Sequence, residues 1–117
     1  MVKKFRGTFT VMVTAFDNHG LIDLDAQARF TQWQVDSGIH GLIPLGSTGE
    51  FLSMSYTERK AIAECVIKTV NGRVPVLVGA GAESTDDVIE NVEMAENLGA
   101  DGTMIIPPFY STPTRSE

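Results

Sequence analysis

Short apolar runs alternate along this chain with longer stretches whose apolar residues recur at helical spacing. The runs that predict strands are residues 8–13, 42–45, 76–78 and 103–106. The stretches that predict helices are residues 24–37, the segment between Ser55 and Gly72, and the segment between Ser84 and Gly99. The pattern therefore predicts the order β-α-β-α-β-α-β. Consecutive strands joined by helices run parallel, so we expect an all-parallel sheet.

Polar residues mark the expected ends of the helices. Asp23 is the expected N-cap of the first helix, and Ser84 that of the third. Ser55 and Glu58 form a capping box at the start of the second helix, which Asn71-Gly72 closes. On the third helix, the apolar stripe expected to face the core consists of Val88, Val92, Ala95 and Leu98.

Two α/β architectures fit this order of elements within a single domain of residues 1–117. One is a small, open, doubly wound sheet of the flavodoxin type. The other is part of a (β/α)₈ TIM barrel, of which the chain supplies about four strands and three helices. A length of 117 residues favours the first, because a whole barrel takes about 250 residues. The last residues, from Pro107 onward, favour the second, because they look like a loop that leads into another helix.

Composition excludes several classes of protein. The chain is 43% hydrophobic and 21% charged, with a net charge of −6, which argues against disorder and against a nucleic-acid-binding surface. No apolar run approaches the about 20 residues that cross a membrane, and we expect a cytoplasmic protein. The single cysteine, Cys65, excludes an intrachain disulfide and is expected to be a small buried residue without reactivity. His19 and His40 have no second ligand at metal-binding spacing, so no metal is expected.

The most informative segment is Gly46-Ser47-Thr48-Gly49, a tight turn directly after the apolar strand 42–45. Its glycines let the backbone approach a ligand closely, and its two hydroxyls and neighbouring amides offer donors to a carboxylate or phosphate. Such a turn at the carboxyl end of a parallel strand lies where α/β proteins place their active sites. Taken alone, Ser47 and Thr48 could equally serve turn and capping chemistry before a short helix at residues 50–52.

Four motifs lie in order at the ends of consecutive strands. They are Gly7-Thr8 with Thr14-Ala15-Phe16, residues 46–50, residues 74–81 and Pro107-Pro108-Phe109-Tyr110. With these four motifs, the sequence resembles the dihydrodipicolinate synthase and N-acetylneuraminate lyase family of class I (Schiff-base) aldolases. The resemblance covers essentially all 117 residues and corresponds to the N-terminal half-barrel of that family.

The resemblance implies a lyase or aldolase that binds pyruvate or another 2-oxo acid as an imine on a lysine, with neither metal nor organic cofactor. It implies that Gly46, Ser47 and Thr48 bind the substrate carboxylate. Ser47 would also pass protons to Tyr110, which in the synthases reaches into a neighbouring subunit's site. Glu50 would be a hydrogen-bonding anchor, and the whole enzyme a homo-oligomer, either a dimer or a tetramer.

Three features differ from the synthases or are missing. Ser47 stands where the synthases usually have threonine, and Pro107-Pro108-Phe109-Tyr110 replaces their usual Thr-Pro-Tyr-Tyr, which leaves the second substrate open. The imine-forming lysine belongs to a later strand of the family, outside this chain. The lysines present precede the first strand or lie in the second helix, where charged residues mostly face water; they are Lys3, Lys4, Lys60 and Lys68.

Two functional alternatives stay open from the sequence. A catalytically inactive half-barrel could associate through its open sheet edges. A flavodoxin-like binding domain is the other. Tyr110 could be an ordinary rim aromatic, and Phe30 and Trp33 are expected to serve packing or subunit contact.

Overall fold

The computed structural model describes residues 4–116, and over these residues strands and helices alternate as predicted. The strands are β1 (Phe9–Val11), β2 (Gly41–Ile43), β3 (Leu77–Gly79) and β4 (Gly102–Met104). The helices are α1 (Leu24–Asp36), α2 (Tyr56–Val70) and α3 (Thr85–Asn97), with two short 3₁₀ turns, η1 (Ser47–Gly49) and η2 (Phe51–Ser53), after β2. The first and last strands are shorter than the apolar runs that predicted them, and Val13 and Ile105, which lie outside the strands, are half-exposed.

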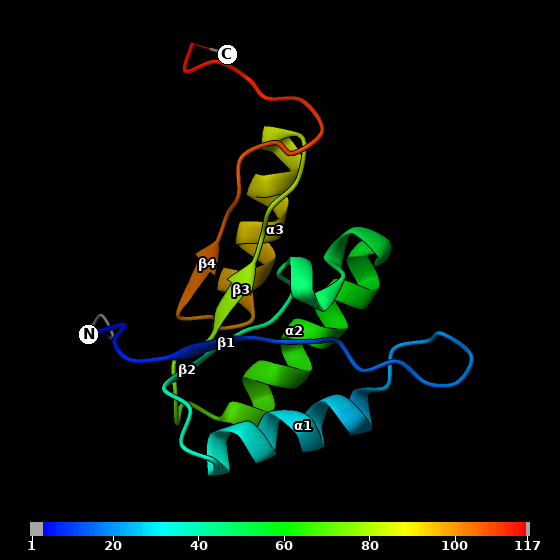
Figure 1. Ribbon diagram of the computed structural model, residues 1–117, viewed down its shortest axis with the longest axis vertical. Helices are drawn as coiled ribbons and strands as arrows, with labels where there is room; N and C mark the ends of the chain where they lie inside the picture. The colour runs from blue at the N-terminus through cyan, green and yellow to red at the C-terminus, as the bar shows by residue number, and fades with distance from the viewer. Residues whose placement is uncertain (1–3, 117) are drawn as a thin grey trace.

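The strands follow one another in the sheet in sequence order. β1 pairs with β2 in parallel, with Phe9 opposite Gly41, and β3 pairs with β4 in parallel, with Leu77 opposite Gly102. A parallel bridge between Leu42 and Val76 joins β2 to β3. Two backbone hydrogen bonds support this junction, from the Leu42 N–H to the Pro75 oxygen (3.0 Å) and from the Gly79 N–H to the Pro44 oxygen (2.9 Å). These pairings give the order β1-β2-β3-β4. Figure 1 shows β3 and β4 side by side.

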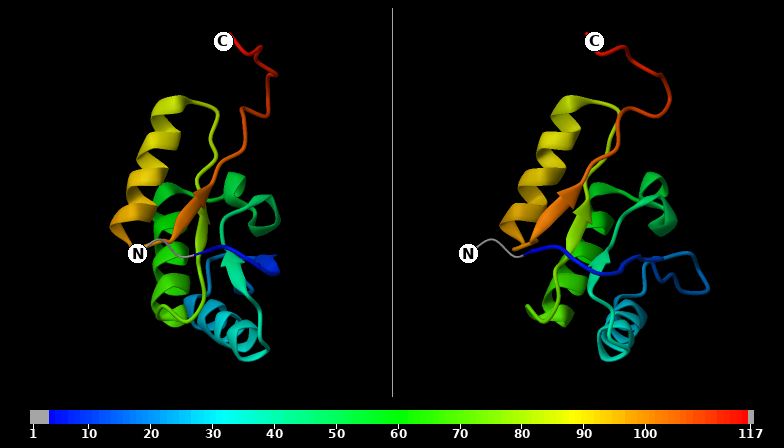
Figure 2. Two further views of the ribbon diagram at one scale, coloured as in Figure 1. Left: turned by 90° about the vertical axis from the view of Figure 1, so that its left-hand side faces the viewer. Right: turned by 60° about the vertical axis from the view of Figure 1, so that its left-hand side comes forward.

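All three helices lie on one side of the strands (Figure 2). A doubly wound sheet would reverse its strand order at a switch point and carry helices on both faces. The flavodoxin-like alternative is therefore wrong for this chain. Sequential parallel strands with helices on a single face are the arrangement of part of a (β/α) barrel. No helix among residues 4–116 is long and apolar enough to cross a membrane.

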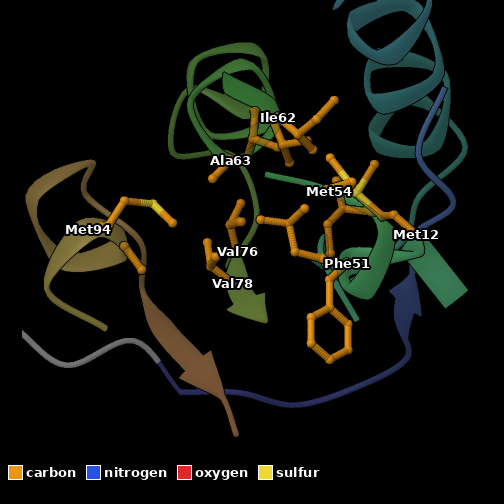
Figure 3. Close-up of a cluster of buried hydrophobic side chains, with 13 residues drawn as sticks. Met12, Phe51, Met54, Ile62, Ala63, Val76, Val78 and Met94 are labelled. Carbon is orange, nitrogen blue, oxygen red and sulfur yellow. The ribbon is translucent and has the colours of Figure 1, made fainter. Parts of the chain in front are cut away.

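The core lies between the sheet and α2. Ile62, Ala63 and Val66 of α2 are fully buried, and they belong to the same cluster as Leu42 and Val78 of the strands (Figure 3). The strand residues alternate, so that Met12 is buried against the helical layer while Val11 and Val13 on either side of it are exposed. The face of the sheet opposite the helices is thus uncovered within the described residues.

Helix α3 buries only part of the predicted stripe. Ala95 is buried and Leu98 packs against the core as expected, whereas Val88 and Val92 are only half-buried. Asn91 and Met94, outside the predicted stripe, are buried. The reason is a polar contact, since the Asn91 side chain donates a hydrogen bond to the Ala80 oxygen at 3.4 Å and so takes a core-facing position. An apolarity pattern cannot anticipate a buried amide of this kind.

The predicted caps are confirmed. The Asp23 carboxylate accepts the Ala26 N–H at 2.8 Å, and the Ser84 hydroxyl oxygen accepts the Asp87 N–H at 3.1 Å. Ser55 and Glu58 form the expected capping box, with bonds of 3.2 and 2.8 Å. The helix boundaries are therefore set by local side chains, as the sequence indicated.

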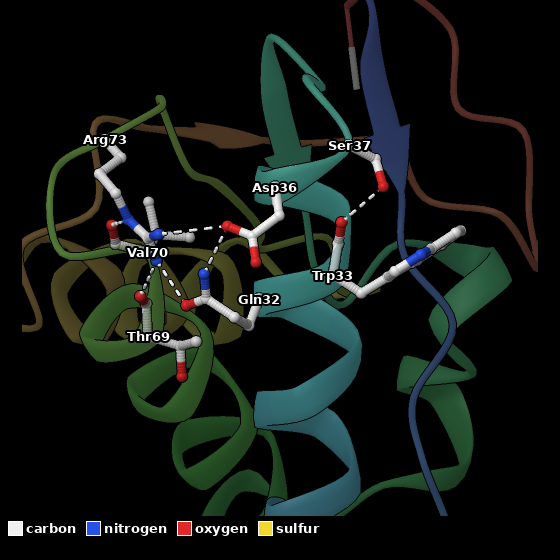
Figure 4. A network of polar contacts seen from close by, with 7 residues as sticks. All are labelled: Gln32, Trp33, Asp36, Ser37, Thr69, Val70 and Arg73. Atoms are coloured by element: carbon white, nitrogen blue, oxygen red, sulfur yellow. Dashed lines mark hydrogen bonds and ion pairs between the residues drawn. The ribbon is translucent and has the colours of Figure 1, made fainter.

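A polar network ties the C-terminal ends of α1 and α2 together at the amino ends of the strands (Figure 4). The Arg73 guanidinium donates to Gln32 Oε1 (2.8 Å) and to the Thr69 oxygen (2.7 Å), and it lies 3.8 Å from Asp36 Oδ1. Trp33, next to this network, is 63% exposed and stacks on Phe30 at 6.0 Å between ring centroids. The expected packing role of Phe30 and Trp33 is met in part by this mutual contact.

β2 and β3 approach one another most closely beyond the end of the β2 ladder. Leu45 adopts a left-handed conformation (φ 63°) although it is neither glycine nor asparagine, and its side chain is 2% exposed. This turns its carbonyl toward Gly79, where a Cβ atom would overlap the Leu45 oxygen and carbon. Only glycine fits at position 79.

Gly79→Ala is therefore expected to destabilise the chain by roughly 3 kcal/mol, because a backbone atom must move to admit the methyl group. Gly72→Ala is the matched control. Gly72 has a positive φ (75°), but no atom lies within 4 Å of an added Cβ, so this substitution should lower the free energy of unfolding by only about 1 kcal/mol. Urea unfolding of the two variants checks this, and equal losses of stability would contradict the close-approach argument.

Candidate active site at the carboxyl ends of the strands

The turn after β2 is held between two residues in the left-handed region. Leu45 (φ 63°) precedes it and Glu50 (φ 60°) follows it. Strained backbone of this kind persists only where the surroundings enforce it, and it concentrates at functional sites. The four residues in between, Gly46-Ser47-Thr48-Gly49, form the start of the loop that leads to α2.

The backbone of this turn is anchored to the β1 run at its Gly49 end and closed by a hydrogen bond of its own. The Thr14 hydroxyl, buried at the end of the β1 run, donates a 2.7 Å hydrogen bond to the Gly49 oxygen. The Gly49 N–H donates to the Gly46 oxygen at 3.0 Å. Gly46 and Gly49 are buried, and a Cβ on Gly49 would lie 3.0 Å from the Met12 oxygen, so the turn packs directly on β1.

Ser47 and Thr48 are exposed between these buried glycines. Across residues 4–116, neither their hydroxyls nor their amides have a hydrogen-bond partner. A cavity of about 30 Å³, room for a water-sized group, lies beside Ser47. Its walls come from the ends of three strands and include Gly46, Gly79 and Met104. Unpaired donors on a fixed backbone beside a small cavity can bind an anionic group.

Tyr110 lies in the loop after β4, at the same end of the sheet as the turn. Its side chain is 95% exposed, and its hydroxyl makes no hydrogen bond to any described residue. The structure therefore does not bring Tyr110 and Ser47 into contact within one chain. The ring projects away from the surface of its own chain.

Glu83, in the loop between β3 and α3, is a site residue that the sequence analysis missed. Its Oε1 accepts the N–H groups of Phe109 (3.0 Å) and Tyr110 (2.8 Å). The Phe109 ring also meets the Phe51 ring edge-on at 6.1 Å between centroids. The sequence feature that could have indicated Glu83 is its position, because it is an acidic residue shortly after the predicted strand 76–78 and the glycines that follow it.

The Glu50 carboxylate makes no hydrogen bond within residues 4–116, so the expected side-chain anchor is not found there. Glu50 acts through its backbone, which accepts the Ser53 N–H (3.0 Å) and donates to the Ser47 oxygen (3.1 Å).

His40 has a structural contact just before β1, where its Nδ1 accepts the Thr8 N–H at 2.9 Å. No three His, Cys, Asp or Glu residues of the described chain gather as a metal site.

None of the described lysines lines the cavity beside Ser47. Lys4, Lys60 and Lys68 are exposed, and Lys3 lies outside the described residues. Lys68 pairs with Glu64 at 2.7 Å on the surface of α2, and this hydrogen bond holds the pKa of Glu64 below its usual value. None of the described lysines is buried, whereas an imine-forming lysine lies desolvated in a pocket.

Comparison with known proteins identifies the family. A sequence profile of the dihydrodipicolinate synthetase family matches residues 4–117. The chain belongs to the dihydrodipicolinate synthetase family. The 4-hydroxy-tetrahydrodipicolinate synthase of Bradyrhizobium diazoefficiens is 44% identical over 112 residues, which are 96% of this chain and 38% of that protein. The chain thus spans about 38% of the length of this relative of the dihydrodipicolinate synthetase family.

Solved structures of the dihydrodipicolinate synthetase family share the fold. The chloride-inhibited dihydrodipicolinate synthase from Acinetobacter baumannii, in complex with pyruvate, matches with a TM-score of 0.94 and 29% identity, over 97% of this chain and 39% of that one. YagE from E. coli K12, a prophage protein of the same family and also in complex with pyruvate, matches with a TM-score of 0.91 and 37% identity. The match to YagE covers 96% of this chain and 38% of YagE.

Thr14→Val is expected to destabilise the chain by about 1–3 kcal/mol, because it leaves the buried Gly49 oxygen without its donor. Thr14→Ser keeps the hydroxyl and is the matched control. Urea unfolding measures the difference. Equal stability of the valine and serine variants would contradict the proposed anchoring of the turn.

The half-buried thiol of Cys65 is expected to react slowly. Burial raises the pKa of Cys65, nearby Asp25 acts in the same direction, and a hydrogen bond with Thr69 opposes both. At a given pH near 8, the folded chain therefore holds less thiolate than the unfolded chain. Alkylation by iodoacetamide should be slower in buffer than in urea, and its midpoint should lie at higher pH. Faster alkylation of the folded chain would contradict this.

Proposed function

We propose that this chain supplies the carboxylate-binding part of the active site of a lyase or aldolase that acts on pyruvate or another 2-oxo acid. The support is the turn after β2, where Ser47 and Thr48 present unpaired hydroxyls and amides beside a small cavity. Two structural relatives were solved with pyruvate, and both match this chain over nearly its whole length.

The chemistry suits these residue types. Neutral donors fix a carboxylate without competing for the electrophilic carbon next to it. A lysine amine attacks the 2-oxo carbon, water leaves, and the resulting imine accepts the electron pair of the carbon–carbon bond that is formed or broken. We place that lysine outside this chain, because Lys4, Lys60 and Lys68 are exposed and none of them lines the cavity beside Ser47. Neither a metal nor an organic cofactor is required for this step.

Ser47 and Tyr110 are proposed to move the protons of this reaction. A serine hydroxyl passes a proton when a phenol lies within hydrogen-bond distance. Within one chain the two groups are not in contact, and the Tyr110 ring is 95% exposed. We therefore propose that Tyr110 completes the site of a second subunit, and that the active protein is a homo-oligomer.

The open sheet supports a second candidate, a catalytically inactive half-barrel that associates through its edges. Within residues 4–116 the outer edges of β1 and β4 have no partner strand. Val13 and Ile105 next to these edges are 50% and 51% exposed. Unpaired strand edges beside apolar side chains promote pairing with another chain. Self-association without pyruvate binding would favour this candidate.

Pyruvate added to the ¹⁵N-labelled chain is expected to shift the amide resonances of Ser47 and Thr48. Ser47→Ala should weaken this binding about tenfold, the effect of one lost hydrogen bond to a charged group. Borohydride added to the same sample should leave the mass unchanged, because this chain supplies no imine-forming amine.

Ser53→Ala, in the same loop but after the turn, is the control variant and should bind as the parent chain does. Absence of shifts at Ser47 and Thr48 at saturating pyruvate would overturn the carboxylate-binding role. A covalent pyruvate adduct on the chain would instead overturn the placement of the lysine outside it.

A further inference from the structure

The loop after β4 is fastened to the rest of the chain by one carboxylate. Glu83 Oε1 accepts two consecutive backbone amides, those of Phe109 at 3.0 Å and Tyr110 at 2.8 Å. Hydrogen bonds to an ionised acceptor are about twice as strong as those between neutral groups. Glu83 is separated from these partners by 26 and 27 residues, so the two bonds join separate loops. In Figure 1 the segment after β4 passes the loop that enters α3.

A ring contact fastens the same loop on its other side. Phe51, 7% exposed, follows the candidate carboxylate-binding turn, and its ring meets Phe109 edge-on at an interplanar angle of 88°. Figure 3 shows the Phe51 ring projecting from the core cluster. Phe109 is thus fixed by its amide to the loop after β3 and by its ring to the loop after β2. Three strand ends are linked through one residue.

Tyr110 is held in a different way. Its ring makes almost no contact with its own chain, since the side chain is 95% exposed. Its N–H, however, forms the shorter of the two bonds to Glu83. The position of the ring relative to the strands is therefore set through the backbone, and the group that holds the backbone is Glu83.

We propose that Glu83 is a positioning residue that holds the loop after β4 and so fixes where the Tyr110 ring enters the active site. This assignment rests on the proposed proton-transfer role of Tyr110. The chemistry requires an acceptor oxygen at the end of a side chain of this length. Glutamine keeps that oxygen, whereas alanine removes it.

Amide hydrogen exchange of the full chain tests the positioning directly. Glu83→Ala should accelerate exchange at Phe109 and Tyr110 about tenfold, the loss expected for a charge-assisted bond. Glu83→Gln should restore most of the protection, and Glu90→Ala, an exposed carboxylate of α3, should change neither amide. Unchanged exchange at both amides in Glu83→Ala would overturn the proposal. Equal acceleration at the core amides of Leu42 and Val78 would also overturn it, because the effect would then be global.

Kinetics separate positioning from a merely structural role. In the assembled protein that includes the imine-forming lysine, Glu83→Ala should lower kcat about tenfold and leave KM for pyruvate within about twofold, since Ser47 and Thr48 are untouched. Glu83→Gln should retain most of kcat. A raised KM with unchanged kcat would overturn the assignment. Absence of any pyruvate adduct in that protein would overturn the proposed function instead, while the exchange result would still report on Glu83.

Discussion

The contact between the Leu45 carbonyl and Gly79 determines how the functional end of this chain is built. Leu45 has to adopt a left-handed conformation to turn the chain out of β2, and its carbonyl then occupies the space where any side chain at position 79 would lie. The buried Leu45 side chain stabilises this conformation through the core it shares with α2. The turn that carries Ser47 and Thr48 starts directly after this junction, so its position follows from the approach of β2 to β3.

The carboxyl ends of β1, β2, β3 and β4 are linked by contacts of different chemical kinds. A hydroxyl of Thr14 holds the turn after β2, a carboxylate of Glu83 holds the loop after β4, and an aromatic pair joins the two loops. Each of these contacts acts on the backbone or on a buried ring. The groups with proposed chemical roles, Ser47, Thr48 and Tyr110, take part in none of these side-chain contacts and are exposed.

Local patterns in the sequence predicted the elements and most of their ends. The caps at Asp23, Ser55 and Ser84 were predictable because each depends on neighbours within three residues. The burial of Asn91 on α3 was not, because its side chain reaches a carbonyl eleven residues earlier. Strand order was also beyond local patterns, since both barrel and doubly wound sheets begin with the same alternation.

The candidate site was predictable to a similar degree. Glycines and hydroxyls in a row after an apolar strand identified residues 46–49, because that chemistry is local. Glu83 was missed, because a carboxylate that binds an amide 26 residues away produces no local sequence pattern. The separation of Ser47 from Tyr110 within one chain has no local pattern either, and only the resemblance, which implies a Tyr110 that reaches into a neighbouring subunit, pointed to it.

The Arg73 network and the candidate site lie at opposite ends of the strands. The network fastens α1 to α2 at the amino ends of the strands, on the side opposite to the candidate site. In barrels of this kind residues on that side contribute to stability and those at the other rim to chemistry. Substitutions in the loops at the carboxyl ends of the strands therefore leave the Arg73 contacts intact. Those loops can change during evolution without loss of the packing between α1 and α2.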